Sequence, residues 1–153
     1  PDLAESSGIF LCPSLWFFAG TEVSEGRGTD KPFQQYGYPK MPNGNTKFTP
    51  KSIDGVAKYP KLEKKKCIGV DLSETPLESL RKMSQLNLNW LISTYQGYPN
   101  KDEFFKAKFF DKLAGSSELR QQIVAEKTAD EIRATWKKGL EDFRVIREEY
   151  LLY

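Results

Sequence analysis

The residue types best suited to chemistry gather in one short stretch, residues 19–30. Its glycines allow positive φ and close approach of the backbone to a ligand, and its arginine presents a planar set of donors to carboxylate, phosphate or hydroxyl oxygens. The stretch predicts either a loop that presents polar groups for binding, or a turn that Arg27 and Asp30 merely stabilise. The candidate substrate-binding residues are Thr21, Glu22, Ser24, Glu25, Gly26, Arg27, Gly28, Thr29 and Asp30.

The carboxylates of this stretch suggest a glycosidase, which uses two carboxyl groups ~5–9.5 Å apart. Nearness in sequence does not establish that distance, and most surface carboxylates have no chemical role. The triplet at 26–28 is too short for a nucleotide-binding fingerprint and lacks the strand–loop–helix context. Four aromatic residues could stack on sugar rings, although core packing is their usual role: Trp16, Tyr36, Tyr38 and Tyr98.

The composition excludes several classes of function. The chain has no histidine, which rules out Ser-His-Asp and Cys-His catalysis within it and argues against a zinc site. No motif indicates a cofactor. The net charge of +2 points to no nucleic acid, and the basic run at 61–66 is predicted to be a solvated hairpin tip because no aromatic residues interleave with it. No segment approaches the ~20 apolar residues of a membrane span.

Length and cysteine content indicate the number of domains and the state of the thiols. A chain of 153 residues, 39% of them hydrophobic, predicts one domain over residues 1–153. Cys12 and Cys67 lie among apolar residues, which favours buried free thiols and leaves one disulfide open. The sequence starts at Pro1 without a methionine, so we expect a fragment or a processed form of a longer protein.

The first half carries the signals of a small antiparallel sheet. Pro13 and Gly20 bracket a short helix or strand, and proline in a first helical position favours the helix. Strands are predicted at 33–38, at 46–53 with a proline that belongs on an edge, and at 67–72, where apolar residues alternate.

The second half changes to helical periodicity. Capping-box patterns begin helices at Thr75 and at Thr128; the first runs to Gly97, with a break near Gln85 left open. Shorter helical turns follow Gly97, and one of them ends at Gly115. The last helix has a single apolar stripe that we expect to belong to the core: Ile132, Trp136, Leu140, Phe143, Ile146 and Tyr150. The predicted fold is α+β, a small sheet packed by helices from the second half.

The residues also resemble a known family, the exo-β-N-acetylmuramidases, long listed as a domain of unknown function. The likeness runs in order through the whole chain, and the block from Gly20 to Phe33 is its most specific part. The other matching segments are Pro13-Ser14-Leu15, Gly37-Tyr38-Pro39, Phe48-Thr49-Pro50, Gly69-Val70-Asp71-Leu72, the run from Phe109 to Gly115, Trp136 and the run from Arg147 to Tyr153.

This resemblance implies the C-terminal domain of a peptidoglycan hydrolase that releases terminal N-acetylmuramic acid from non-reducing glycan ends. Family members have an N-terminal Rossmann-like domain, thought to hold the catalytic centre, and a C-terminal domain that closes the substrate cleft. We therefore expect the catalytic residues in an N-terminal domain outside this chain, no hydrolysis by this chain alone, and a periplasmic or cell-envelope location. Arg27 is expected to hold the lactyl carboxylate or to anchor the loop.

One position departs from the family pattern. The block in the family reads Phe-Glu-Gly-Thr, and this chain has Ala19 where the glutamate stands. Glu22, three residues further on, could replace that carboxylate in part. The departure keeps a second interpretation open, in which the domain is a non-catalytic sugar-binding or interdomain module of a degenerate homologue.

Overall fold

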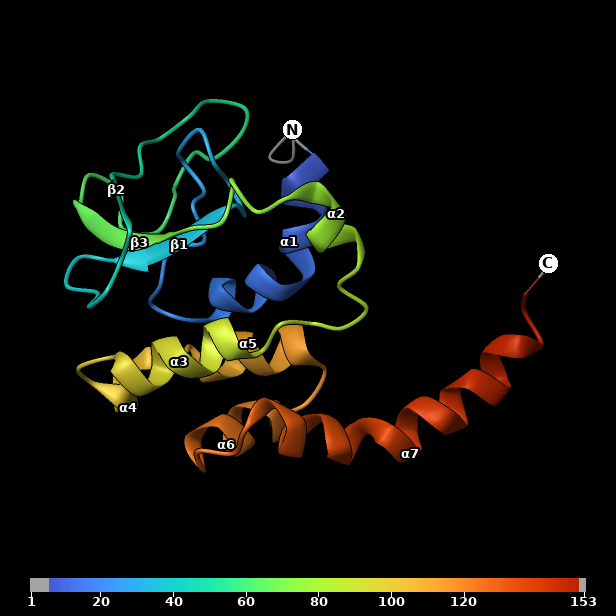
Figure 1. Cartoon of the computed structure of the whole chain (residues 1–153). Helices are drawn as coiled ribbons and strands as arrows, with labels where there is room; N and C mark the ends of the chain where they lie inside the picture. The colour runs from blue at the N-terminus through green and yellow to red at the C-terminus, as the bar shows by residue number, and fades with distance from the viewer. Residues whose placement is uncertain (1–5, 152–153) are drawn as a thin grey trace.

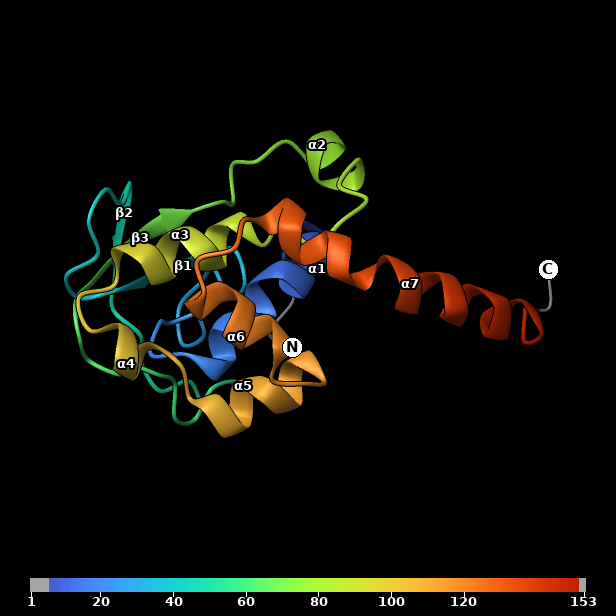
Figure 2. The ribbon, with the colours of Figure 1, turned by 90° about the horizontal axis from the view of Figure 1, so that it is seen from below.

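The computed structural model describes residues 6–151. Its centre is a three-stranded antiparallel sheet with helices below it and long loops above it in the view of Figure 1. The last helix, α7 (Ala129–Glu148), starts against this body and then runs away from it, as both views show (Figures 1 and 2). The architecture is therefore α+β, as predicted.

The sheet has the order β1-β3-β2, with β1 (Gln35–Tyr38), β2 (Thr46–Phe48) and β3 (Cys67–Asp71). It begins later than predicted because Phe33 has a φ of 56°, which turns the chain before β1. The edge strand β2 stops two residues before Pro50, as a proline that cannot donate to the ladder requires. A Cβ at Gly37 of β1 would lie 2.2 Å from the Ile68 carbonyl oxygen of β3, so the close approach of these two strands needs glycine.

The first helix of the described chain is longer than predicted. The helix α1 (Ser6–Leu15) continues into a 3₁₀ helix, η1 (Trp16–Gly20), so Pro13 lies inside a helix and not at its first position. Leu11 and Leu15 are fully buried. Burial of this apolar face outweighs the local cost of the proline, and the prediction of the helix start was wrong for that reason.

Beneath the sheet lie α3 (Asn89–Gly97), α4 (Lys101–Phe104) and α5 (Ala107–Ala114). Below them, α6 (Glu118–Val124) lies at the level of the start of α7 (Figure 1). Phe18, Phe104 and Phe110 are completely buried between these elements. Phe18 stacks on Tyr36 of β1 with ring centroids 4.7 Å apart, which joins η1 to the sheet. Gly115 ends α5 in the left-handed conformation, as its sequence position predicted.

The segment from Thr75 to Gly97 contains two helices, α2 (Leu77–Arg81) and α3, so the break near Gln85 is confirmed. The capping box at Thr75 is wrong: α2 begins after Pro76, with no side-chain hydrogen bond at its N-cap. The second capping box forms as predicted. Thr128 Oγ1 accepts from the Glu131 backbone N–H, and the Glu131 carboxylate accepts from the Thr128 N–H.

The apolar stripe of α7 is core only at its beginning. Ile132 is fully buried and Trp136 packs partly on the core, but Leu140, Phe143 and Ile146 are each more than half exposed. The expectation that the whole stripe is core was wrong, because the helix is longer than the body it packs against (Figure 2). Periodicity shows which face is apolar, while the length of the neighbouring surface decides how much of that face is covered.

Both cysteines are free thiols. Burial raises the pKa of the Cys67 thiol to about 11 and also raises that of Cys12. Within residues 6–151, no helix combines the length and the apolar character that crossing a bilayer requires.

Replacing Thr128 by alanine should lower the free energy of unfolding by about 1 kcal/mol, because the first turn of α7 loses a side-chain acceptor for its backbone N–H groups. Thr75→Ala is the matched control: it makes the same change before α2, whose N-cap has no such bond. Chemical denaturation of both variants measures the difference. Equal losses in the two variants would contradict the assignment of the cap.

Candidate functional site

Backbone hydrogen bonds connect the first half of the loop from Gly20 to Asp30 to the segment before α5 and to strand β1. The Glu22 N–H donates to the Phe104 carbonyl at 3.0 Å, and the Lys106 N–H donates to the Gly20 carbonyl at 2.9 Å. Ser24 then pairs with Gly37 of β1 through two backbone hydrogen bonds of 2.9 and 3.0 Å. These bonds hold the loop between the sheet and the start of α5.

Hydroxyl groups and glycines shape the loop from within. Thr21 Oγ1 donates to the Phe18 carbonyl and accepts from the Val23 N–H, and Ser24 Oγ accepts from the Gly26 N–H. Gly26 and Gly28 both have a φ of 80°, and a Cβ at Gly28 would lie 2.6 Å from the Lys51 carbonyl oxygen. Glycine is therefore required at these turns for steric reasons.

The interior of the loop is organised by one lysine. Lys61 Nζ donates to the carbonyl oxygens of Phe18, Thr21 (3.1 Å) and Val23 (2.6 Å). The same ammonium forms an ion pair with Glu25 Oε2 at 2.9 Å, and the two side chains are only 19% and 6% exposed. Burial lowers the pKa of Lys61, although the Glu25 carboxylate opposes that effect. The expectation of a solvated tip at 61–66 is thus wrong at Lys61.

The candidate residues of the loop separate into two groups. The buried residues are Thr21, Ser24, Glu25, Gly26 and Gly28. The residues that reach the surface at least in part are Glu22, Arg27, Thr29 and Asp30. Glu22 Oε1 lies 3.3 Å from Lys106 Nζ in an ion pair that is about two-fifths exposed at both ends. The structure brings these residues together on one loop, and their role in substrate binding stays a prediction.

A pocket of about 500 Å³ opens on one side of the loop, and we call it the Ala19 pocket. Trp16, 43% exposed, stacks on Phe33 with ring centroids 5.6 Å apart and forms an aromatic wall. Because Glu25 is neutralised by Lys61, the remaining charges on this pocket are mostly positive. Its defining lining residues are Trp16, Ala19, Glu25, Arg27, Lys61 and Lys106.

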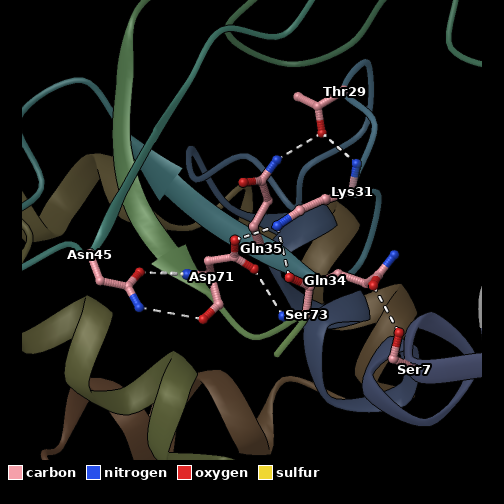
Figure 3. Close-up of polar contacts among 8 residues, drawn as sticks. All are labelled: Ser7, Thr29, Lys31, Gln34, Gln35, Asn45, Asp71 and Ser73. Carbon is pink, nitrogen blue, oxygen red and sulfur yellow. Dashed lines mark hydrogen bonds and ion pairs between the residues drawn. The ribbon is translucent and has the colours of Figure 1, made fainter. Parts of the chain in front are cut away.

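A second pocket, of about 450 Å³, opens on the other side of the loop, over the face of the sheet that carries Gln35 and Asp71; we call it the sheet-face pocket. Figure 3 shows its polar network: Gln35 Nε2 donates to Thr29 Oγ1 at 2.8 Å, and Lys31 Nζ donates to Asp71 Oδ2 at 2.7 Å. Asn45 Oδ1 accepts from the Asp71 N–H at 2.8 Å, which joins the network to the start of β2.

Asp71 is the titratable centre of that network. Burial raises the pKa of its carboxyl group, but hydrogen bonds from Lys31 and Ser73 outweigh burial and hold the pKa below its usual value. The carboxylate is therefore charged and engaged within the chain. This makes it a structural group that shapes the pocket and not a proton donor near neutral pH.

Sequence reasoning missed Lys61 and Lys106 as members of the site. Both come from segments far from the loop in the chain, and neither lies in a recognisable spacing. Trp16 was weighed as a residue that could stack on sugars or belong to the core, and the structure places it on the wall of the Ala19 pocket. Within residues 6–151, no group of three or more His, Cys, Asp or Glu side chains is arranged to hold a metal ion.

Replacing Lys61 by methionine should lower the free energy of unfolding by about 3–5 kcal/mol, because Glu25 is left as an uncompensated buried charge and three carbonyls lose their donor. Denaturant titration measures this change. Lys58→Met is the matched control, since Lys58 is exposed three positions earlier and should change stability by less than about 0.5 kcal/mol.

The double variant Lys61→Met with Glu25→Gln isolates the buried pair. It should recover part of the loss, because the unpaired carboxylate is gone. A loss for Lys61→Met no larger than that for Lys58→Met would show that Lys61 does not hold the loop.

Comparison with protein families identifies a match over residues 10–153 to the model described as exo-beta-N-acetylmuramidase NamZ, C-terminal. Among curated proteins, the peptidoglycan beta-N-acetylmuramidase NamZ of Bacillus subtilis (strain 168) is 29% identical over the whole of this chain. The chain spans only 39% of the length of that relative.

Two solved structures from Bacteroides fragilis NCTC 9343, both described as DUF1343 family proteins, share the fold. The first is 45% identical with a TM-score of 0.92, and the match covers 100% of this chain and 42% of that one. The second is 19% identical with a TM-score of 0.69 over 94% of this chain and 41% of its own, which shows the fold alone. The family match extends over nearly all of the sequence, so this chain belongs to the exo-beta-N-acetylmuramidase NamZ family, whose C-terminal domain it contains.

Proposed function

We propose that the full-length protein removes terminal N-acetylmuramic acid from the non-reducing ends of peptidoglycan glycan. In this proposal the present chain is the C-terminal domain, which closes a substrate cleft against an N-terminal domain that carries the catalytic residues. The observation that carries the proposal is the Ala19 pocket, because Glu25, Arg27 and Phe33 of the sequence block most specific to the family line it. Action on peptidoglycan also leads us to propose a periplasmic or cell-envelope location.

The charges of the Ala19 pocket match an anionic sugar. Muramic acid differs from glucosamine by a lactyl group whose carboxylate is ionised at neutral pH. Arg27 and Lys106 line the pocket and provide cationic donors, and arginine is suited to bidentate contact with a carboxylate. Lys61 lies beneath the loop with only 19% of its side chain exposed, whereas Lys106 is 43% exposed, so we assign substrate contact to Lys106 and to Arg27.

The aromatic wall supports the same assignment. The indole of Trp16 is held by its stack on Phe33 and still exposes part of its surface to the pocket. A held aromatic ring offers an apolar face at little cost in conformational entropy, and the C–H face of a pyranose is a suitable partner for it. The pocket thus combines a carboxylate-binding side with a sugar-stacking side.

Because residue 19 is alanine, the pocket lacks one carboxylate that the family pattern provides. Ala19 lines the pocket, at the position where the family pattern places a glutamate. Lys106 lines the same pocket, and its N–H donates to the carbonyl of the next residue, Gly20. The nearest replacement is Glu22, whose carboxylate already lies 3.3 Å from Lys106 Nζ. We propose that Glu22 takes over the role of the absent glutamate by holding Lys106 towards the substrate.

The variant Arg27→Ala in the full-length protein should lower kcat/KM on a chromogenic β-N-acetylmuraminide by roughly 10- to 100-fold, the loss expected for a hydrogen bond to a charged group. Lys47→Ala, an exposed lysine of the sheet-face pocket, is the control and should retain the parental rate. The 153-residue chain alone should hydrolyse nothing. Unchanged kinetics for Arg27→Ala would remove this residue from substrate binding.

A second experiment tests the exchange of carboxylates. Glu22→Gln should lower kcat/KM by about tenfold, because Lys106 loses its charged partner. Adding Ala19→Glu to that variant should restore activity at least in part, since a carboxylate returns to the same ammonium. A full-length protein in which Glu22→Gln has no effect, or in which Ala19→Glu creates activity that the parent lacks, would refute the exchange; the second result would indicate a degenerate homologue.

A further inference from the structure

The second half of α7 exposes an apolar face that the described fold does not use. Figures 1 and 2 show this half leaving the body of the molecule. The large side chains on the stripe are exposed to 53% at Leu140, 58% at Phe143, 55% at Ile146 and 77% at Tyr150. Scattered exposed hydrophobic residues are normal, but a continuous face of this kind marks an interaction surface.

This face continues the one that anchors α7 to the core. Ile132 is fully buried. Phe143 lies on the same side of α7, because the two positions are eleven residues apart, which is about three helical turns. Arg133 Nη2 also ties the start of the helix to the Leu86 carbonyl at 2.9 Å. The base of α7 is thus held in place, and its apolar side is presented in a set direction beyond the body.

A glycine lies within the exposed part of the stripe. Gly139 is one turn before Phe143, and apart from the neighbouring backbone of its own helix no described atom lies within 4 Å of the position that its Cβ would occupy. Glycine weakens a helix interior, and here no neighbour in the described part of the chain requires it. A glycine on an apolar helix face lets a second backbone or a large side chain approach closely.

We propose that the apolar stripe formed by Leu140, Phe143 and Ile146 of α7, together with Tyr150 just after the helix, packs against the N-terminal part of the same full-length polypeptide. The proposal rests on the two-domain organisation proposed above. This chain matches a domain described as C-terminal and spans 39% and 42% of two relatives. The 45% identical structure covers all of this chain, α7 included, so the helix is a shared part of a longer protein.

A second copy of the chain fits the stripe less well. Stable interfaces bury about 800 Å² on each partner and involve some 20–30 residues a side, whereas this stripe has four large side chains on one helix. A domain of the same polypeptide needs less area, because its effective concentration is already in the millimolar range. The small size of the face therefore favours an intramolecular partner.

Hydrogen exchange by mass spectrometry on the full-length protein tests the proposal. Amides in the segment 139–150 should be protected in the parent. Phe143→Asp should reduce that protection by about tenfold or more, because a charge enters the apolar contact. Val145→Asp is the matched control: Val145 is 66% exposed on the opposite side of the same helix, and its replacement should leave protection within about threefold of the parent.

Light scattering over a range of concentrations completes the test. We expect a monomer whose protection of 139–150 does not depend on concentration. Protection that rises together with a dimer mass would assign the face to a second copy, and rapid exchange in the parent, or equal effects of the two variants, would overturn the contact. Muraminide hydrolysis is measured on the same samples: a protected helix in a protein without hydrolysis would leave this inference standing and refute the proposed function alone.

Discussion

The candidate site depends on one buried ammonium group. Lys61 Nζ holds three carbonyls of the chain between Phe18 and Val23 and the carboxylate of Glu25. A loop with little regular secondary structure is thereby given a single conformation. The cost of burying the charge, visible in the lowered pKa of Lys61, is offset because every donor faces an oxygen atom.

This constraint decides what the loop offers to a ligand. With Glu25 neutralised from within, the Ala19 pocket presents Arg27, Lys106 and the indole of Trp16, a combination suited to an anionic sugar. On the opposite side of the same loop, the pair of Lys31 and Asp71 is satisfied internally. The two pockets share one loop and differ in the charged side chains that line them, which is why the proposed carboxylate-binding role is assigned to the Ala19 pocket.

The described fold has a complete hydrophobic core and, outside that core, an exposed apolar helix face. Its sheet and inner helices bury a complete core around Phe18, Phe104 and Phe110, while the outer half of α7 carries an apolar face beyond that core. In the two proposals, the Ala19 pocket and the exposed half of α7 both face a further domain of the full-length polypeptide. The relatives, of which this chain spans about two-fifths, have the length for such a domain.

Features that depend on residues close together in the chain could be read from the sequence. The turn at Gly115, the cap at Thr128, the α+β order of elements and the family block from Gly20 to Phe33 could all be predicted locally. Other features follow from the three-dimensional fold. Lys61 is largely buried beneath the loop while Lys64 to Lys66 are exposed, and Thr75 does not cap α2. The apolar stripe of α7 is core at Ile132 but exposed at Phe143. Burial and ion pairing depend on contacts between segments that are distant in the chain. A residue pattern shows which face of an element is apolar or charged, but not which other segment packs against that face.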